Sequence, residues 1–145
     1  MIEKEQFKRV LEPIHKTFWK RAYKKLLRKI STLKSSLKRR SHEYGVLFDI
    51  NSRDLKVLFL THYGKECKYC DKILKLNTIA CDHIVPISKD GPSVINNLQL
   101  ICRTCNTRKG PLDEKDFLDI VKWVSMQKEE VSKYVLRKLA KGGRY

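Results

Sequence analysis

Apolar residues recur every three or four positions through the first third of the chain, and this spacing predicts a long amphipathic helix. Pro13 suits the first turn of such a helix. The other faces are rich in lysine and arginine and end on Lys38-Arg39-Arg40, where cations favour a helix C-terminus. We therefore expect a basic helical arm over residues 1–45. The predicted apolar stripe consists of Ile14, Phe18, Ala22, Leu26, Ile30, Leu33 and Leu37.

Two further stretches show helical spacing, and the simplest interpretation is that they form helices that supply or cover the hydrophobic core. Asn51 or Ser52 can cap a helix that ends at Gly64. Its apolar side holds Leu55, Leu58 and Phe59. After Asp113, a plausible cap, the predicted buried positions are Phe117, Ile120, Val121 and Val124. The same rhythm continues over residues 129–140, so residues 113–145 are expected to form a C-terminal helical extension.

The middle of the chain predicts two strands and a short helix. Residues 78–84 are β-branched and apolar enough for a strand, and Pro86 would stop its ladder of hydrogen bonds. Residues 98–101 can form the returning strand, and residues 104–109 a short helix before Gly110. The fold class expected is α+β, with a small strand-strand-helix core over residues 46–112.

The chain is strongly basic, and the excess lies mainly in the arm. Its 145 residues hold 32 Lys or Arg against 16 Asp or Glu, which gives a formal net charge of +16. Residues 1–45 alone hold 14 Lys or Arg and 4 Asp or Glu. A polyanion is the expected partner. The length allows one compact domain plus the arm and excludes large multidomain machines.

The basic face of the arm has three interpretations. Dense positive charge releases counterions from a nucleic-acid duplex, which favours phosphate contacts by Lys20, Lys24, Arg28, Arg39 and Arg40. The face could instead be only solvated, on a helix that simply packs. A third interpretation is a membrane surface or a partner of the calmodulin type.

The sequence also predicts a location. The longest apolar stretches, such as residues 57–60, are four residues long, against the roughly 18 that cross a bilayer. Residues 1–10 lack the apolar core of a secretory signal. We therefore expect a cytoplasmic protein, in a reducing compartment where cysteines more often hold metal than pair as disulfides.

Four of the five cysteines form two short hooks, Cys67-Lys68-Tyr69-Cys70 and Cys102-Arg103-Thr104-Cys105. Each hook can present two thiolates to one tetrahedral ion, and four thiolates select a structural Zn²⁺. The alternative is two chance pairs left as reduced thiols. The hooks are separated by 31 residues, more than the 15 to 20 of compact zinc fingers, so further structure is expected between them.

Residues suited to metal binding and to proton transfer lie within and beside this insert. Asp82 and Asn106 offer hard oxygen ligands suited to Mg²⁺ or Mn²⁺. His83 beside such a cation can take a proton from water, which makes phosphodiester hydrolysis the natural reaction. Because adjacent strand residues point to opposite faces, Asp82 and His83 can flank one phosphate only if the strand bulges or ends there.

Each candidate also has a purely structural interpretation. His83 could be a satisfied core histidine, Asp82 a surface carboxylate and Asn106 a helix cap. Asn97 could only turn its loop. Cys81 is best interpreted as a small buried residue. Arg103, Arg108 and Lys109 could hold phosphates or could simply be solvated.

Three separated motifs, in order and framed by the hooks, resemble the HNH endonuclease family, with the ββα-metal fold and a four-cysteine zinc. They are Asp82-His83-Ile84-Val85-Pro86, Asn97-Leu98-Gln99-Leu100 and Cys102-Arg103-Thr104-Cys105-Asn106-Thr107-Arg108-Lys109-Gly110. The resemblance covers roughly residues 46–112. It implies that His83 is the general base, that Asp82 and Asn106 bind the catalytic metal, and that Asn97 holds the loop that orients the base. Family members typically leave 3′-hydroxyl and 5′-phosphate ends.

Some members of the family carry further histidines where this chain has Asn106 and Gly110. This departure favours a loosely held Mg²⁺ or Mn²⁺ over a tightly held zinc in the catalytic position. The resulting hypothesis is a DNA endonuclease with a one-metal mechanism, either a nickase or a double-strand cutter. The alternative is a non-catalytic zinc-stabilised module that binds nucleic acid, and no residue excludes an RNA-cleaving relative. A homodimer, or a complex of phage or mobile-element proteins, is compatible with a compact basic chain of this kind.

Overall fold

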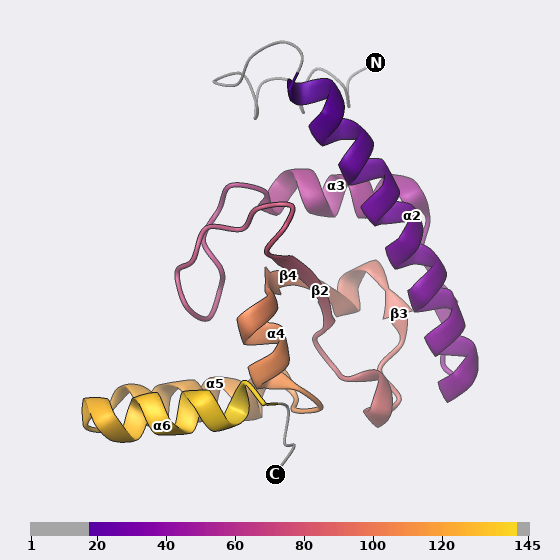
Figure 1. Cartoon of the computed structure of the whole chain (residues 1–145). Coiled ribbons are helices and arrows are strands. Elements are labelled where there is room, and N and C mark those ends of the chain that lie inside the picture. Colours follow the sequence, from indigo (N-terminus) through magenta and orange to yellow (C-terminus); the bar gives the residue numbers. More distant parts are fainter. Residues whose placement is uncertain (1–17, 142–145) are drawn as a thin grey trace.

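The structure is a computed structural model and describes residues 18–141, except for the side chain of Trp19. Helix α2 (Phe18–Tyr44) is followed by the short strand β1 (Phe48–Asp49) and by α3 (Ser52–His62). Two longer strands follow, β2 (Ile79–His83) and β4 (Leu98–Cys102), and the short strand β3 (Ser93–Val94) lies between them in the sequence. Helices α4 (Arg103–Lys109), α5 (Glu114–Ser125) and α6 (Glu129–Leu139) complete the chain (Figure 1). The predictions for Pro13 and Ile14 lie outside the described residues.

The strand-strand-helix core predicted for the middle of the chain is confirmed. Strands β2 and β4 are antiparallel, in a register that pairs Ile79 with Cys102 and His83 with Leu98. Helix α4 begins at Arg103, directly after β4. The described chain is therefore of mixed helix and sheet class, with a ββα unit at its centre (Figure 1).

A second, very small sheet ties the β2–β4 loop to the end of α2. Strands β1 and β3 pair in parallel, with Phe48 opposite Ser93, and the Ser93 amide donates to the Leu47 carbonyl at 2.8 Å. The sequence did not predict this sheet, because strands of two residues are too short to show an alternation of apolar and polar positions. Its position matters, since it carries Ser93 into the centre of the molecule.

Helix α2 contributes to the same hydrophobic core as the ββα unit. Its buried positions are Ala22, Leu26, Ile30 and Leu37, and they join one cluster with Leu55 and Phe59 of α3 and with Leu100 and Ile101 of β4. Leu33 is half-buried, whereas Phe18 is 54% exposed. The predicted stripe therefore packs from Ala22 to Leu37, and the basic arm is part of the core.

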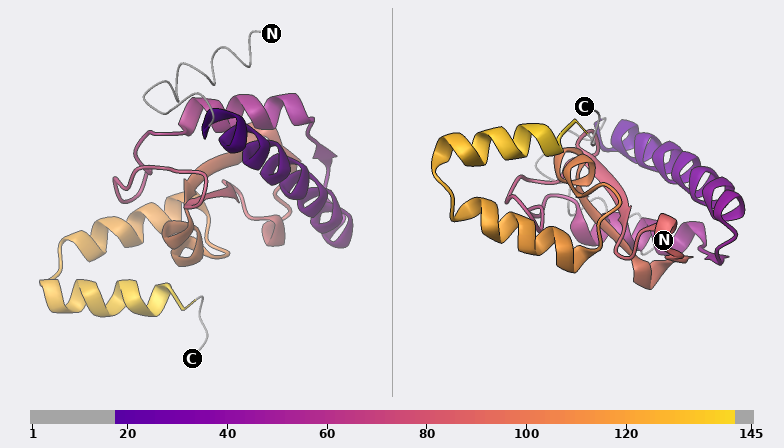
Figure 2. Two further views of the ribbon diagram at one scale, coloured as in Figure 1. Left: turned by 45° about the horizontal axis from the view of Figure 1, so that its top comes forward. Right: turned by 90° about the horizontal axis from the view of Figure 1, so that it is seen from below.

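Helix α3 has the predicted cap, because the Asn51 side chain accepts from the Asp54 amide at 2.9 Å. The helical pattern expected after Asp113 and its continuation over residues 129–140 form two helices, α5 and α6. They form a hairpin that turns at residues 126–128, where the Met126 amide bonds the Trp123 carbonyl. Figure 2 shows this hairpin and α2 on opposite sides of the ββα unit. None of the helices within residues 18–141 combines the length and apolar character of a membrane span.

Candidate active site and metal centre

The four cysteines of the two hooks lie together at one end of β4. Their sulfur atoms all lie within 4.8 Å of one another, and Cys70 Sγ and Cys102 Sγ are 3.5 Å apart. Sulfurs around a tetrahedral Zn²⁺ are separated by about 3.8 Å, given Zn–S bonds of about 2.3 Å. The donor set and its spacing therefore fit zinc.

Local backbone structure aims these sulfurs at one another. Cys102 ends β4 and caps α4, so its sulfur accepts from the Cys105 amide at 3.4 Å. The Cys102 amide in turn donates to the Cys67 sulfur at 3.3 Å. Such N–H contacts stabilise thiolates. The ββα unit thus supplies half of the metal centre from two residues three positions apart, Cys102 at the end of β4 and Cys105 in the first turn of α4.

Asp82, His83 and Asn106 line one open cleft of about 350 Å³. Asp82 and His83 come from the end of β2, and Asn106 comes from α4. Adjacent residues of a strand point to opposite faces unless the strand bulges or ends. Strand β2 ends at His83, so Asp82 and His83 can face one site. Arg40 and Tyr44, from the last turns of α2, also line this cleft.

The His83 imidazole is anchored by two buried serines. His83 Nε2 lies 2.9 Å from Ser93 Oγ, Ser93 Oγ lies 2.7 Å from Ser41 Oγ, and Ser41 Oγ lies 2.8 Å from the Leu37 carbonyl oxygen. A carbonyl only accepts and a hydroxyl has one hydrogen, so only one arrangement makes all three contacts hydrogen bonds. Ser41 donates to Leu37, Ser93 to Ser41 and His83 Nε2 to Ser93. This arrangement leaves Nδ1 as the basic nitrogen.

The surroundings of His83 favour its neutral form. Burial, followed by the charges of Arg40 and Lys109, lowers the pKa of His83 to about 4. The imidazole is therefore uncharged near neutral pH and has a lone pair with which to accept a proton.

Asp82 belongs to a buried polar network. Its Oδ2 accepts from Gln99 Nε2 at 2.9 Å and pairs with Lys109 Nζ at 3.0 Å. Lys109 also donates to the His83 carbonyl oxygen at 2.8 Å. Within residues 18–141, no hydrogen bond or ion pair engages Asp82 Oδ1, so this oxygen is free to bind a cation.

The burial of Lys109 corrects an expectation. Its side chain is 0% exposed, because the ammonium is committed to Asp82 and to the backbone. Lys109 therefore does not lie on the surface, where it was expected to contact nucleic-acid phosphates. Pairing compensates the cost of burying either charge alone.

The Asp82 network continues to the first cysteine hook. Gln99 Nε2 also donates to the Tyr69 hydroxyl at 3.0 Å, and Tyr69 donates to Glu114 Oε1 at 2.9 Å. Burial raises the pKa of Tyr69, so its hydroxyl stays protonated and can donate. The only sequence signal for Gln99 was a polar residue inside an otherwise apolar strand.

Asn97 fastens the loop between β2 and β4. Its Oδ1 accepts from the Val85 amide at 2.9 Å, and its Nδ2 donates to the carbonyls of Val85 and Pro92 at 3.1 and 2.8 Å. The loop segment after His83 is therefore held on the segment before β4. Cys81, on β2, lines the cleft, and burial raises the pKa of its thiol to about 12.

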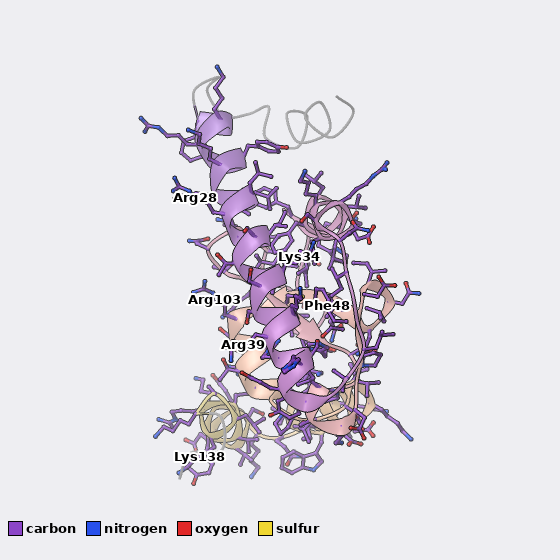
Figure 3. All side chains as sticks on the ribbon, turned by 90° about the vertical axis from the view of Figure 1, so that its right-hand side faces the viewer. Arg28, Lys34, Arg39, Phe48, Arg103 and Lys138 are labelled. Atoms are coloured by element: carbon purple, nitrogen blue, oxygen red, sulfur yellow. The ribbon has the colours of Figure 1, made fainter. Side chains whose placement is uncertain are left out.

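Exposed cations lie along α2 and at the start of α4. Figure 3 labels Arg28 and Arg39 of α2 and Arg103 of α4. Lys20 and Lys24 are exposed as well, and Arg39 pairs with Glu43 at 2.6 Å. Arg108 is half-buried, and within the described chain its Nε has no hydrogen-bond partner.

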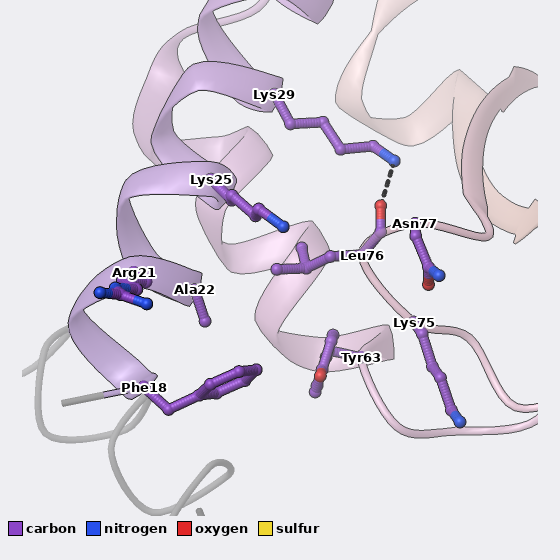
Figure 4. A pocket seen from close by; sticks show the side chains of 9 residues that line it. All are labelled: Phe18, Arg21, Ala22, Lys25, Lys29, Tyr63, Lys75, Leu76 and Asn77. Carbon is purple, nitrogen blue, oxygen red and sulfur yellow. Dashed lines mark hydrogen bonds between the residues drawn. The ribbon is translucent and has the colours of Figure 1, made fainter. Parts of the chain in front are cut away.

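A second cavity, of about 500 Å³, lies beside the first turns of α2 and contains none of the predicted catalytic or metal residues (Figure 4). Phe18, Tyr63 and Leu76 supply apolar lining. Lys29 reaches past it to donate to the carbonyls of Leu76 and Ile79, at 2.6 and 2.8 Å. Burial, with the nearby charge of Arg103, lowers the pKa of Lys29. Lys29 therefore acts as a structural link between α2 and β2.

Comparison with known proteins identifies the central segment. The family model described as HNH endonuclease matches residues 67–112, about a third of the chain. The matched range contains the four clustered cysteines together with Asp82, His83, Asn97 and Asn106. The resemblance seen in the motifs is thus confirmed for residues 67–112, which match the HNH family model. No curated protein matches the chain.

Proposed function

We propose that the protein is a metal-dependent endonuclease that hydrolyses phosphodiester bonds of DNA. One observation carries the proposal: Asp82 and His83, at the end of β2, and Asn106, on α4, line a single cleft inside the segment that matches the HNH family. The neutral imidazole of His83 and the exposed cations on α2 support it. DNA is the substrate proposed because HNH domains act on nucleic acids and the chain is strongly basic.

The cleft fits a divalent cation of the hard type. Asp82 Oδ1 and the Asn106 amide oxygen are the residues that would hold Mg²⁺ or Mn²⁺, both of which prefer oxygen ligands and keep several waters. When bound, such an ion supplies Lewis-acid polarisation of a phosphoryl oxygen. Lys109 and Gln99 fix the other carboxylate oxygen, which sets the orientation of Asp82.

His83 is the proposed general base. In the proposed reaction, Nδ1 takes a proton from the attacking water while Nε2 stays bonded to Ser93. The water oxygen forms a bond to phosphorus as the bond from phosphorus to the 3′ oxygen breaks, and the leaving oxygen takes a proton from solvent. The ends expected from the family resemblance are a 3′-hydroxyl and a 5′-phosphate. Asn97 keeps the loop beside His83 in place during these steps.

The four-cysteine centre is proposed to bind a structural zinc ion. Four thiolates close every position around the ion, so it has no role in the reaction itself. One cleft serves one strand, so a single copy is expected to nick the duplex. A double-strand break would need two copies or two successive events.

Cleavage of supercoiled plasmid DNA with added Mg²⁺ or Mn²⁺ tests the proposal. The parent protein is expected to give nicked or linear product, and His83→Ala to lose about 10²- to 10⁴-fold in rate, the range for a general base. His62→Ala is a matched control, because His62 lies outside the cleft and bonds the Leu58 carbonyl of its own helix.

The competing function is a zinc-stabilised module that binds nucleic acid without cutting it. In that case the parent and His83→Ala would both retard DNA on a gel, and neither would cut it with either metal. Cleavage of RNA but not of plasmid DNA would change the proposed substrate from DNA to RNA, but it would not contradict the proposed catalytic residues.

A further inference from the structure

Arg40 is the charged residue of the cleft that the HNH resemblance leaves without a role. It lies in the last turns of α2, upstream of the matched range 67–112, yet it lines the same cleft as Asp82, His83 and Asn106. The helix that looks from its sequence like an accessory basic arm thus delivers one guanidinium to the reaction site.

The environment of Arg40 differs from that of its neighbour Arg39. Arg40 is half-buried, and within the described residues its Nε is shielded from solvent and has no hydrogen-bond partner. No carboxylate within residues 18–141 lies at ion-pair distance from Arg40, whereas Arg39 is exposed and pairs with Glu43 at 2.6 Å. A shielded N–H donor without a partner is costly, so Arg40 is suited to an acceptor that arrives with a ligand.

The charges in the cleft favour an anion at this position. Lys109 offsets the carboxylate of Asp82, at 3.0 Å. The guanidinium of Arg40, which lines the same cleft, then remains as an uncompensated positive charge. A phosphodiester carries one negative charge on two oxygens, which the guanidinium fork can bind together.

The orientation of Arg40 is fixed by the residues next to it on the helix. Leu37 and Ser41 are both 0% exposed, and Ser41 Oγ bonds Ser93 at 2.7 Å. These contacts fix the rotation of α2 about its axis, so the adjacent Arg40 must face the cleft. The same helical turn therefore positions both Ser41, which is linked to His83 through Ser93, and the guanidinium of Arg40.

We infer that Arg40 is a catalytic residue that donates hydrogen bonds to the non-bridging oxygens of the phosphodiester being cut and stabilises their charge in the transition state. The inference rests on the proposed nuclease function. The inference gives Arg40 a different role from Arg28 and Arg39, whose exposed positions suit binding of flanking phosphates. Stabilisation of developing charge by a positioned donor acts mainly on the rate of the chemical step.

Single-turnover cleavage at saturating DNA, together with DNA affinity measured without added Mg²⁺ or Mn²⁺, tests this role. Arg40→Ala is expected to lower the saturated rate by about 10²- to 10³-fold, the loss typical of one such donor, with a much smaller change in affinity. Arg40→Lys keeps a charge but loses the fork, so an intermediate rate is expected. Arg137→Ala is the matched control, because Arg137 is an exposed arginine of α6 outside the cleft, and it is expected to keep the saturated rate.

The outcomes separate this inference from the nuclease proposal. If the parent cuts DNA and Arg40→Ala cuts it at the parent rate when saturated, or loses no more rate than Arg137→Ala, the catalytic role of Arg40 is wrong. A parent that does not cut would instead overturn the proposed function. Zinc content and circular dichroism identify a misfolded Arg40→Ala, in which case Arg40→Lys decides: a parent-like saturated rate overturns the role, and a reduced one supports it.

Discussion

At the scale of single residues, the serine that holds His83 is as specific a feature of the site as the histidine. Ser93 is 0% exposed and accepts from His83 Nε2 in the only arrangement that satisfies both serines. Ser93→Ala removes this acceptor and lets the imidazole turn or change tautomer. We expect the cleavage rate at saturating DNA to fall about 10- to 100-fold, as for other partners that orient a catalytic group.

DNA affinity should not change in Ser93→Ala, because Ser93 is buried and cannot touch the substrate. Ser125→Ala is the control, since the Ser125 hydroxyl bonds only the Lys122 carbonyl on an exposed face of α5. A rate equal to that of the parent would show that the tautomer of His83 does not depend on Ser93.

The buried pair of Lys109 and Asp82 leads to a prediction about stability. Lys109→Met keeps most of the side-chain volume but leaves the Asp82 carboxylate without its counter-charge, at a site where Asp82 is 9% exposed. Removing one partner of a buried pair costs about 3 to 5 kcal/mol. Urea unfolding of the zinc-loaded protein would measure this loss, with the exposed Lys115→Met as control. Lower DNA affinity at unchanged stability would instead place Lys109 among the phosphate contacts.

Residue types and spacing select Asp82, His83, Asn97 and Asn106 as candidates, because their chemistry is uncommon and their motifs stand in order, and the structure brings three of them, Asp82, His83 and Asn106, to one cleft. The partners that orient them could not be selected in the same way. Ser41 and Ser93 are 52 residues apart, and hydroxyl groups carry no periodic signal. Lys109 looked like its exposed neighbours, since only the fold buries it.

At the scale of elements, the loop between β2 and β4 depends on one close approach. A Cβ atom on Gly91 would lie 1.9 Å from the Val85 carbonyl oxygen and 2.7 Å from that of Pro86, and both are backbone atoms that cannot turn aside. Gly91→Ala must therefore displace the loop, which also carries Ser93 and Asn97. We expect a loss of about 1 to 3 kcal/mol of stability, as for other forced overpacking.

Because the displaced loop orients His83, Gly91→Ala should lose cleavage activity as well as stability. Thermal unfolding and plasmid cleavage on the same sample would measure both effects. Asn96→Ala, an exposed change in the same loop, is expected to alter neither. If Gly91→Ala cut DNA normally, the geometry of this loop would not control the base.

The long helices followed from hydrophobic periodicity, because each is long enough to show it. The two longer strands and the short helix α4 followed instead from residue types and from the positions of Pro86 and Gly110. The small sheet of β1 and β3 did not follow, because it is determined by backbone hydrogen bonds, such as the one from the Ser93 amide to the Leu47 carbonyl, which leave no mark on the apolar pattern.

At the scale of the whole molecule, α2 has three roles at once. Its buried side, from Ala22 to Leu37, belongs to the same core as the ββα unit. Its outer side carries exposed arginines such as Arg28 (Figure 3). Its last turns supply Arg40 to the cleft and Ser41 to the link with His83. In the proposed function, packing, substrate binding and catalysis are therefore coupled through one helix that lies outside the matched HNH segment.

The zinc centre is expected to control folding of the whole ββα unit, because its ligands end β4 and begin α4. Binding energies of about 10 to 16 kcal/mol for zinc-finger peptides exceed the roughly 5 to 15 kcal/mol by which a domain is normally stable. Cys70→Ala should therefore lose bound zinc and cooperative unfolding together. The network from Tyr69 through Gln99 to Asp82 should then lose its anchor, and cleavage should fail.

The fifth cysteine provides the control for this prediction. Cys81 lies outside the four-sulfur cluster, on the neighbouring strand β2, so Cys81→Ala should keep one zinc ion per chain and a cooperative transition. Metal analysis and thermal unfolding of both variants would distinguish the two positions. Equal zinc content in Cys70→Ala and the parent, or loss of zinc in Cys81→Ala, would contradict the assignment of the cluster. Loss of zinc from Cys70→Ala without loss of the folded state would instead show that hydrophobic packing of α2 and α3 alone stabilises the ββα unit.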